Sequence, residues 1–181
     1  HLLNVYADDF SFEPWLAATA SVRFYSRSRN IDEMSGVNLR LYPVQHLYTV
    51  RDRSVLDPVF ERAAATRLPV YWTGCPTPGS ILGSTPLDGL EELASAFPTV
   101  PIVLSAYNYR DFYRIQLLMR AASNVYLEIS CYHGVEGVRE FSRAFGADRV
   151  LLGTGYGLQY AGIGVGKLET ADVSKDARAL I

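Results

Sequence analysis

Several side chains that can move protons follow or interrupt the apolar runs of this sequence. His46 and Tyr48 come shortly after one such run, and Glu128 interrupts another. Tyr156 lies among glycines after a third. Imidazole, phenol and carboxyl groups act as general acids and bases once a fold brings them together. We therefore take these four residues as the candidate catalytic set.

A second group of side chains at the ends of apolar runs suits the binding of a substrate. Arg40 supplies a guanidinium, which pairs well with carboxylates, and the other members supply hydroxyl, amide and thiol groups. The candidate binding residues are Arg40, Thr73, Tyr107, Asn108 and Cys131.

Each of the more reactive candidates also has a structural interpretation. His46 in a loop more often hydrogen-bonds that loop than acts in catalysis. A buried Glu128 needs a partner, and Arg40 could pair with it inside the fold. A nucleophilic pair of Cys131 and His133 is disfavoured because no third group is evident to orient the histidine.

The sequence carries no established metal or nucleotide motif. The histidines, which form neither H-x-H nor H-E-x-x-H, are His1, His46 and His133. The glycine-rich stretch Gly153–Lys167 is not a P-loop, because Ala161 and Leu168 replace a required glycine and hydroxyl. We interpret this stretch as a flexible strand-to-helix connection. The sequence therefore predicts neither a metal site nor another cofactor.

Short β-rich runs recur about every 25–30 residues, the length of one strand-plus-helix unit. They are mostly apolar on both faces, which is typical of strands in parallel sheets covered by helices. The predicted strands are Val37–Val44, Leu68–Thr73, Pro101–Ala106, Asn124–Ser130 and Arg149–Thr154.

The stretches between these runs have apolar residues at helical spacing. The predicted helices are Ser54–Thr66, Thr85–Phe97, Asp111–Ala122, Gly134–Phe145 and Ser174–Ile181. Earlier in the chain we expect two further strands and a short helix: Leu3–Ala7, Val22–Ser26 and Phe12–Ala20.

Repeated strand-helix units predict an α/β fold in which functional side chains collect at the carboxyl ends of parallel strands. The pattern alone fits both a short or incomplete (β/α) barrel and an open doubly wound sheet. We expect one domain over residues 1–181.

Composition limits the classes of partner. The chain has 181 residues and a net charge of −2, so it offers no basic field for nucleic acid. No apolar run approaches the roughly 20 residues that span a bilayer. Two cysteines, Cys75 and Cys131, cannot build a disulfide framework. We expect a cytoplasmic protein that binds a small-molecule ligand or substrate, without nucleic acid or membrane.

Several segments resemble the amidohydrolase-related family of TIM-barrel metal-dependent hydrolases, which also includes decarboxylases. Their order and spacing carry the resemblance, which extends from about Gly36 to Ile181. The segments are RLYPVQHLY (Arg40–Tyr48), LDPVFERAAATRLPVYWTG (Leu56–Gly74), FPTVPIVLSA (Phe97–Ala106), NVYLEIS (Asn124–Ser130) and GADRVLLGTGYG (Gly146–Gly157). The resemblance implies a (β/α) barrel that is shortened at its N-terminal side.

The chain departs from this family where the resemblance implies metal chemistry. The family's two strand-end histidines correspond to Thr73 and Ala106, and its catalytic aspartate corresponds to Gly155. The family's H-x-H is not found. We therefore expect a barrel without the family's metal-dependent hydrolysis.

Three functional hypotheses stay open at this point. The first is a diverged hydrolase or lyase that works without a metal. The second is a non-catalytic barrel that binds a small, neutral ligand in a tyrosine-lined mouth or serves as a subunit partner. The third is an open α/β binding domain. A homo-oligomer is also expected, because the edges of a short barrel leave surface for association.

Overall fold

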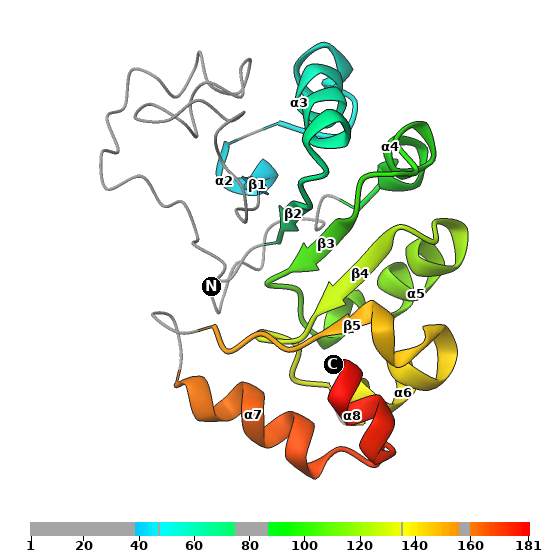
Figure 1. Cartoon of the computed structure of the whole chain (residues 1–181). Helices are drawn as coiled ribbons and strands as arrows, with labels where there is room; N and C mark the ends of the chain where they lie inside the picture. The colour runs from blue at the N-terminus through cyan, green and yellow to red at the C-terminus, as the bar shows by residue number, and fades with distance from the viewer. Residues whose placement is uncertain (1–38, 47, 75–86, 135, 156–159) are drawn as a thin grey trace.

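Strands and helices alternate along the chain in the computed structural model, which describes residues 39–46, 48–74, 87–134, 136–155 and 160–181 (Figure 1). The elements are β1 (Leu39–Leu41), α2 (Pro43–His46), α3 (Arg53–Thr66), β2 (Val70–Thr73), α4 (Leu90–Ala96), β3 (Ile102–Ser105), the 3-10 turn η3 (Tyr109–Asp111), α5 (Phe112–Ala121), β4 (Val125–Glu128), α6 (Gly137–Phe145), the 3-10 turn η4 (Ala147–Arg149), β5 (Val150–Leu151), α7 (Ala161–Thr170) and α8 (Lys175–Leu180). The two strands and the helix predicted near the start of the chain lie outside these ranges. No helix in them is long and apolar enough to cross a membrane.

The five strands form one parallel sheet in the order of the sequence, β1-β2-β3-β4-β5. Helices α3, α4, α5 and α6 all lie on the same face of this sheet (Figure 1). A doubly wound sheet would reverse its strand order and carry helices on both faces. The observed arrangement is that of part of a (β/α) barrel, so the barrel prediction is confirmed and the doubly wound alternative is wrong.

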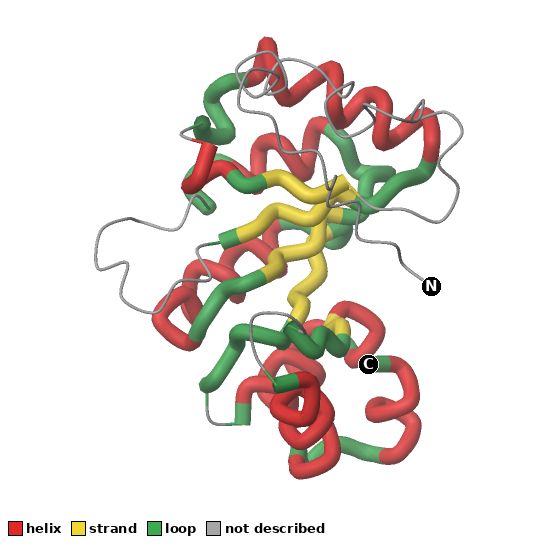
Figure 2. The backbone as a smooth tube through the Cα atoms, turned by 90° about the vertical axis from the view of Figure 1, so that its left-hand side faces the viewer, coloured by secondary structure: helices red, strands yellow, loops and turns green. Residues whose placement is uncertain are grey.

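The hydrophobic core lies between the sheet and these four helices. Successive strand residues point to opposite faces, and the helix-facing set is apolar. The fully buried strand residues of this core are Val70, Trp72, Ile102, Leu104, Val125, Leu127 and Val150. Fully buried helix residues packed with them include Phe60, Leu93, Ile115 and Phe141. Figure 2 views the molecule from the side opposite these helices, with the strands running across its middle.

Strands are shorter than the sequence patterns predict. The first was expected to continue to Val44, but β1 ends at Leu41 and helix α2 begins at Pro43. Proline has no N–H for a strand ladder and is favoured in the first turn of a helix. This short helix places the segment that contains His46 directly beyond β1.

Two helices begin later than predicted because of their backbone conformation. Gly89 before α4 and Glu136 before α6 adopt positive φ angles of 84° and 58°. A residue in the left-handed region cannot belong to a right-handed helix, so each helix starts after it. Helix α6 ends at Phe145, as the sequence predicts, and Gly146 with φ 94° is its C-cap.

Helix α7 corrects the interpretation of Gly153–Lys167 as a flexible connection, because residues 161–170 are helical. Glycine at position 164 allows a close approach: a Cβ there would lie 2.3 Å from the carbonyl oxygen of Gly153. Tertiary packing therefore outweighs the low helix propensity of this stretch.

Candidate functional site

The inner face of the sheet, opposite helices α3 to α6, carries a row of polar side chains near the strand ends. Arg40 on β1 is aligned with Tyr71 on β2, and Thr73 is aligned with Ser105 on β3. Glu128 is the last residue of β4. Alternate residues of a strand and aligned residues of parallel neighbours share a face, so these five side chains lie together.

Hydrogen bonds link this row across three strands. Arg40 Nη1 donates to Ser105 Oγ over 3.1 Å, and Ser105 Oγ donates to Glu128 Oε2 over 2.9 Å. Ser130 donates twice to the same carboxylate, from its hydroxyl to Oε2 over 2.8 Å and from its backbone N–H to Oε1 over 2.6 Å. Glu128, which is 7% exposed, is therefore held by three donors.

The predicted partnership of Arg40 with Glu128 exists, but it is indirect. Ser105 lies between them and uses one hydroxyl to accept from the guanidinium and donate to the carboxylate. These hydrogen bonds orient the Glu128 carboxylate toward its neighbours, and a catalytic role for it stays a prediction.

Glycine at position 153 makes room for this carboxylate. A Cβ there would lie only 1.3 Å from Glu128 Oε1. Gly153 also lies against Gly164 of α7, as described above. The end of β5 is therefore closely packed between Glu128 and helix α7.

Lys167 of α7 hydrogen-bonds to the backbone of the segment that follows β4. Its Nζ donates to the backbone carbonyls of Ile129 over 2.9 Å and Ser130 over 2.6 Å. Burial lowers the pKa of Lys167, and nearby Cys131 and Glu128 act in the opposite direction. Burial, and then the charge of Lys167, lower the pKa of His133, so this imidazole is neutral at pH 7.

The Arg40 guanidinium makes a further contact and has a further hydrogen-bond donor besides the nitrogen that contacts Ser105. Its guanidinium carbon lies 4.7 Å from the centroid of the Tyr71 ring. Burial raises the pKa of Tyr71; Arg40 acts against this shift and Glu128 with it. Arg40 Nε and Thr73 Oγ1 are both buried and have no hydrogen-bond partner among the residues that the structure describes. The site therefore combines a cation, an aromatic ring and a hydroxyl with unused hydrogen-bonding groups.

Tyr107 and Asn108 follow β3. Tyr107 is fully buried, and burial followed by the charge of Asp111 raises the pKa of its hydroxyl well above the usual value. A Cβ at Gly74 would lie 3.2 Å from the Tyr107 ring, so that ring packs on the end of β2. Asn108 Oδ1 accepts from the backbone N–H of Arg110 over 2.9 Å, which caps the turn η3.

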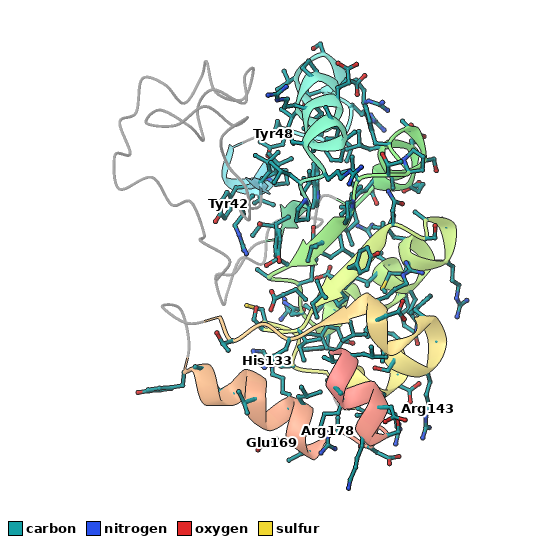
Figure 3. All side chains as sticks on the ribbon, viewed as in Figure 1. Tyr42, Tyr48, His133, Arg143, Glu169 and Arg178 are labelled. Carbon is teal, nitrogen blue, oxygen red and sulfur yellow. The ribbon has the colours of Figure 1, made fainter. Side chains whose placement is uncertain are left out.

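Of the four catalytic candidates, the structure describes the side chains of Tyr48 and Glu128, and a joint catalytic role of the four stays a prediction. Tyr48 makes an edge-on contact with Trp72, 6.2 Å between ring centroids, and Trp72 belongs to the helix-facing side of β2. Figure 3 shows Tyr48 near β1 and His133 near β5, at opposite ends of the sheet. His46 ends α2, but its side chain, like all of Tyr156, lies outside what the structure describes.

Cys131 follows Ser130 in the segment after β4. It is a partly exposed free thiol, 3.7 Å from Ser130 Oγ. It is joined to Glu128 through Ser130, whereas the other cysteine, Cys75, lies outside the described residues. A role for Cys131 in binding stays a prediction.

Ser105 and Lys167 were missed by the sequence analysis. A hydroxyl within the apolar run PIVLSA was the available signal for Ser105. Lys167 offered no such signal, because both of its partners are backbone carbonyls.

The donor set described here does not fit the family's metal ion. Thr73 offers a neutral hydroxyl at one implied ligand position, whereas Ala106 and Gly155 offer no side-chain donor. Across the described ranges, no three or more His, Cys, Asp or Glu side chains are grouped so that they could hold a metal ion.

A separate cavity of about 140 Å³ lies between the start of α6 and helix α7. Lys167 reaches its wall, together with Tyr132 and Glu136. It is lined by neither Arg40 nor Thr73, so it is distinct from the row on the inner face.

The comparison with protein families is consistent with a fold that is part of a (β/α) barrel. The amidohydrolase family model matches residues 29–180, most of the chain. The chain belongs to the amidohydrolase family. Among curated proteins, no sequence gives a significant match to this amidohydrolase-family chain.

Solved structures confirm the fold. An uncharacterised TIM-barrel protein from Bordetella bronchiseptica matches with a TM-score of 0.57 and 15% identity, over 91% of this chain and 68% of its own. The 5-carboxyvanillate decarboxylase LigW from Sphingomonas paucimobilis matches with a TM-score of 0.51 and 18% identity, over 72% of this chain and 51% of its own. A 5-carboxyvanillate decarboxylase from Novosphingobium aromaticivorans, with bound manganese and 3-methoxy-4-hydroxy-5-nitrobenzoic acid, matches with a TM-score of 0.50 and 17% identity, over 72% and 50%. The chain thus spans about half the length of the two decarboxylases.

Proposed function

We propose that this amidohydrolase-family chain binds a small organic acid at the carboxyl ends of β1 to β4, without the family's metal-dependent hydrolysis. The observation that supports the proposal is the hydrogen bonding of the Arg40 guanidinium. One guanidinium nitrogen is fixed by Ser105, whereas the buried Nε has no hydrogen-bond partner in the described part of the chain.

A carboxylate suits this site better than the neutral ligand expected from the tyrosine-rich composition. Guanidinium N–H groups and a hydroxyl donate to carboxylate oxygens, and charge-assisted bonds of this kind are roughly twice as strong as neutral ones. Arg40 and Thr73 supply both kinds of donor. The two decarboxylases of similar fold act on an aromatic acid, which supports the same class of ligand here.

Binding without turnover is supported by the surroundings of Glu128. A general base needs a free lone pair directed at the substrate proton. Three of the about four acceptor positions of the Glu128 carboxylate already accept hydrogen bonds from Ser105 and Ser130, which leaves little capacity for a substrate proton. The residues at the implied metal positions likewise offer no set of ligands. A cytoplasmic location stays a prediction from the sequence.

A ligand screen tests the proposed class. Thermal unfolding of the full chain is followed with benzoate, vanillate and succinate, and with the matching neutral amides. We expect at least one acid to raise Tm and its amide to leave Tm unchanged, because the amide lacks the charge that Arg40 recognises. Stabilisation by acids and amides alike, or by no acid, contradicts the proposal.

The same samples test the absence of catalysis. The acids are incubated with the chain and quantified by chromatography, and the protein's metal content is measured by mass spectrometry. We expect unchanged acid and no stoichiometric divalent metal. Loss of carbon dioxide from an acid would establish a lyase instead, and one equivalent of a divalent metal would contradict the metal-free proposal.

A further inference from the structure

Helix α5 presents large apolar side chains to solvent. Tyr113 and Leu117 lie four residues apart and are 77% and 65% exposed. Tyr109, four residues earlier in the turn η3, is 57% exposed. Residues at this spacing lie on one side of a helix. A continuous row of such side chains, unlike scattered single ones, marks a surface that binds a partner.

Basic side chains border this apolar row. Arg110 and Arg120 are exposed at its two ends. Arg114, on the side of α5 that faces α4, lies 3.4 Å from Asp88, two residues before α4 begins. The outer surface of α5 is therefore large, apolar and positively charged.

The neighbouring helix α4 has the opposite properties. Its buried residues are Leu90, Leu93 and Ala94. Its outward side consists of Glu91 and Glu92 in the first turn and the small residues Ser95 and Ala96 in the last, all exposed. The outer surface of α4 is therefore flat and negatively charged.

We infer that two copies of this chain associate through the α4–α5 surface, with α5 of each copy lying on α4 of the other. A two-fold axis between the helices makes each contact twice. Tyr113 and Leu117 then pack over Ser95 and Ala96 of the second copy. Both halves of the interface are present side by side on one chain (Figure 1).

Charge complementarity favours a second copy over a different protein. The arginines of α5 face Glu91 and Glu92 of the partner helix in this arrangement, and the same pairing recurs across the axis. Pairing α5 with α5 would instead bring arginine against arginine, which opposes association. Exposed Tyr and Arg are also the residue types that contribute most binding energy at interfaces.

Sedimentation of the full chain tests this inference. We expect the wild type to sediment with twice its 20.1 kDa chain mass. Reversing the charges of one helix, in E91K/E92K or in R110E/R120E, raises the dimer dissociation constant by at least about tenfold because like charges then face each other. Combining both pairs of substitutions restores the dimer, because the charges are exchanged between the two helices.

Two controls separate the interface from folding. Glu61→Lys reverses an exposed charge on α3 and leaves the dimer intact. Circular dichroism of every variant checks the fold, and we expect wild-type helix content in each. A monomeric wild type overturns the inference. So does a dimer that persists unchanged in Leu117→Asp, or a combined variant that stays monomeric while folded.

Discussion

Arg40 reaches across β2 to Ser105 on β3, where its Nη1 lies 3.1 Å from the serine hydroxyl. The guanidinium passes over the ring of Tyr71 on the way. Its Nε is buried and without a partner in the described structure. The cation is therefore fixed in direction but keeps a donor for a ligand, and such preorganisation lowers the entropy cost of binding.

Ser105→Ala tests the link between Arg40 and Glu128. The substitution leaves Nη1 and Oε2 each one partner short, so we expect the free energy of unfolding to fall by about 1–3 kcal/mol. Urea denaturation measures the change. Ser123→Ala, at an exposed position after α5, is the control and should have little effect. Equal stability of the two variants would show that the serine link contributes nothing.

Gly153→Ala tests the close packing around Glu128. A Cβ at this position would lie 1.3 Å from Oε1, so the carboxylate must move and its hydrogen bonds to Ser130 must break. We expect a loss of about 2–3 kcal/mol in unfolding free energy. Gly166→Ala on α7 is the matched control: its Cβ meets nothing within 4 Å, and helix propensity predicts a gain of up to about 1 kcal/mol. A Gly153→Ala protein as stable as the control contradicts this packing.

The titration of His133 reports the charge of Lys167. Its pKa lies below the ordinary 6.5 because burial and Lys167 oppose the imidazolium. Lys167→Met therefore moves the pKa of His133 upward, as NMR of the imidazole protons measures. His133→Gln assigns the signal, and Lys175→Met on α8 serves as the charge control. An unchanged pKa in Lys167→Met would refute this coupling.

The lowered pKa of His133 makes the stability of the fold depend on pH in the acid range. As pH falls below 6.5, the unfolded chain protonates His133 before the folded chain does. The unfolded state then binds more protons, so stability falls with pH in this window. We expect His133→Gln to have a shallower loss of stability between pH 6.5 and 5 than the wild type, in urea denaturation at each pH. Parallel curves for the two proteins would contradict it.

Tyr132 makes the stability of the fold depend on pH in the alkaline range, with a sign opposite to that of the His133 effect. Burial, and then Asp111, raise its pKa to about 12 from the ordinary 10. The unfolded chain loses this proton first, so the contribution to stability is complete below pH 10 and is lost as pH rises toward 12. Tyr132→Phe removes the ionisable group and should reduce the loss between pH 9.5 and 11. An equal loss in the variant would show that Tyr132 does not titrate late.

The repeat of strands and helices could be predicted from the sequence because buried parallel strands are apolar on both faces. Arg40 and Glu128 could be nominated because a charge within an apolar run needs a partner. Ser105 was harder to identify, since a serine at a strand end has many common explanations. Its role depends on strand alignment, which places it between two residues 88 positions apart.

Helix α7 could not be predicted because its sequence is rich in glycine, and glycine disfavours isolated helices. The helix forms through contacts far away in the sequence: Gly164 on Gly153, and Lys167 on Ile129 and Ser130. Because these partners are backbone atoms, the residue types in the sequence do not indicate the contacts. The packing of Tyr48 toward Trp72 could not be predicted for a related reason, because sequence order does not reveal which face of the sheet this side chain meets.

The most direct test of the proposed acid site is the affinity of Arg40→Gln for the acids of the screen, measured by titration calorimetry. Arg67→Gln, at an exposed position before β2, is the matched control. The account predicts that Arg40→Gln binds the acid at least about tenfold more weakly, a loss of about 1.4 kcal/mol or more. The control should bind like the wild type. An Arg40→Gln protein that stays folded and binds the acid as tightly as the wild type would contradict the account.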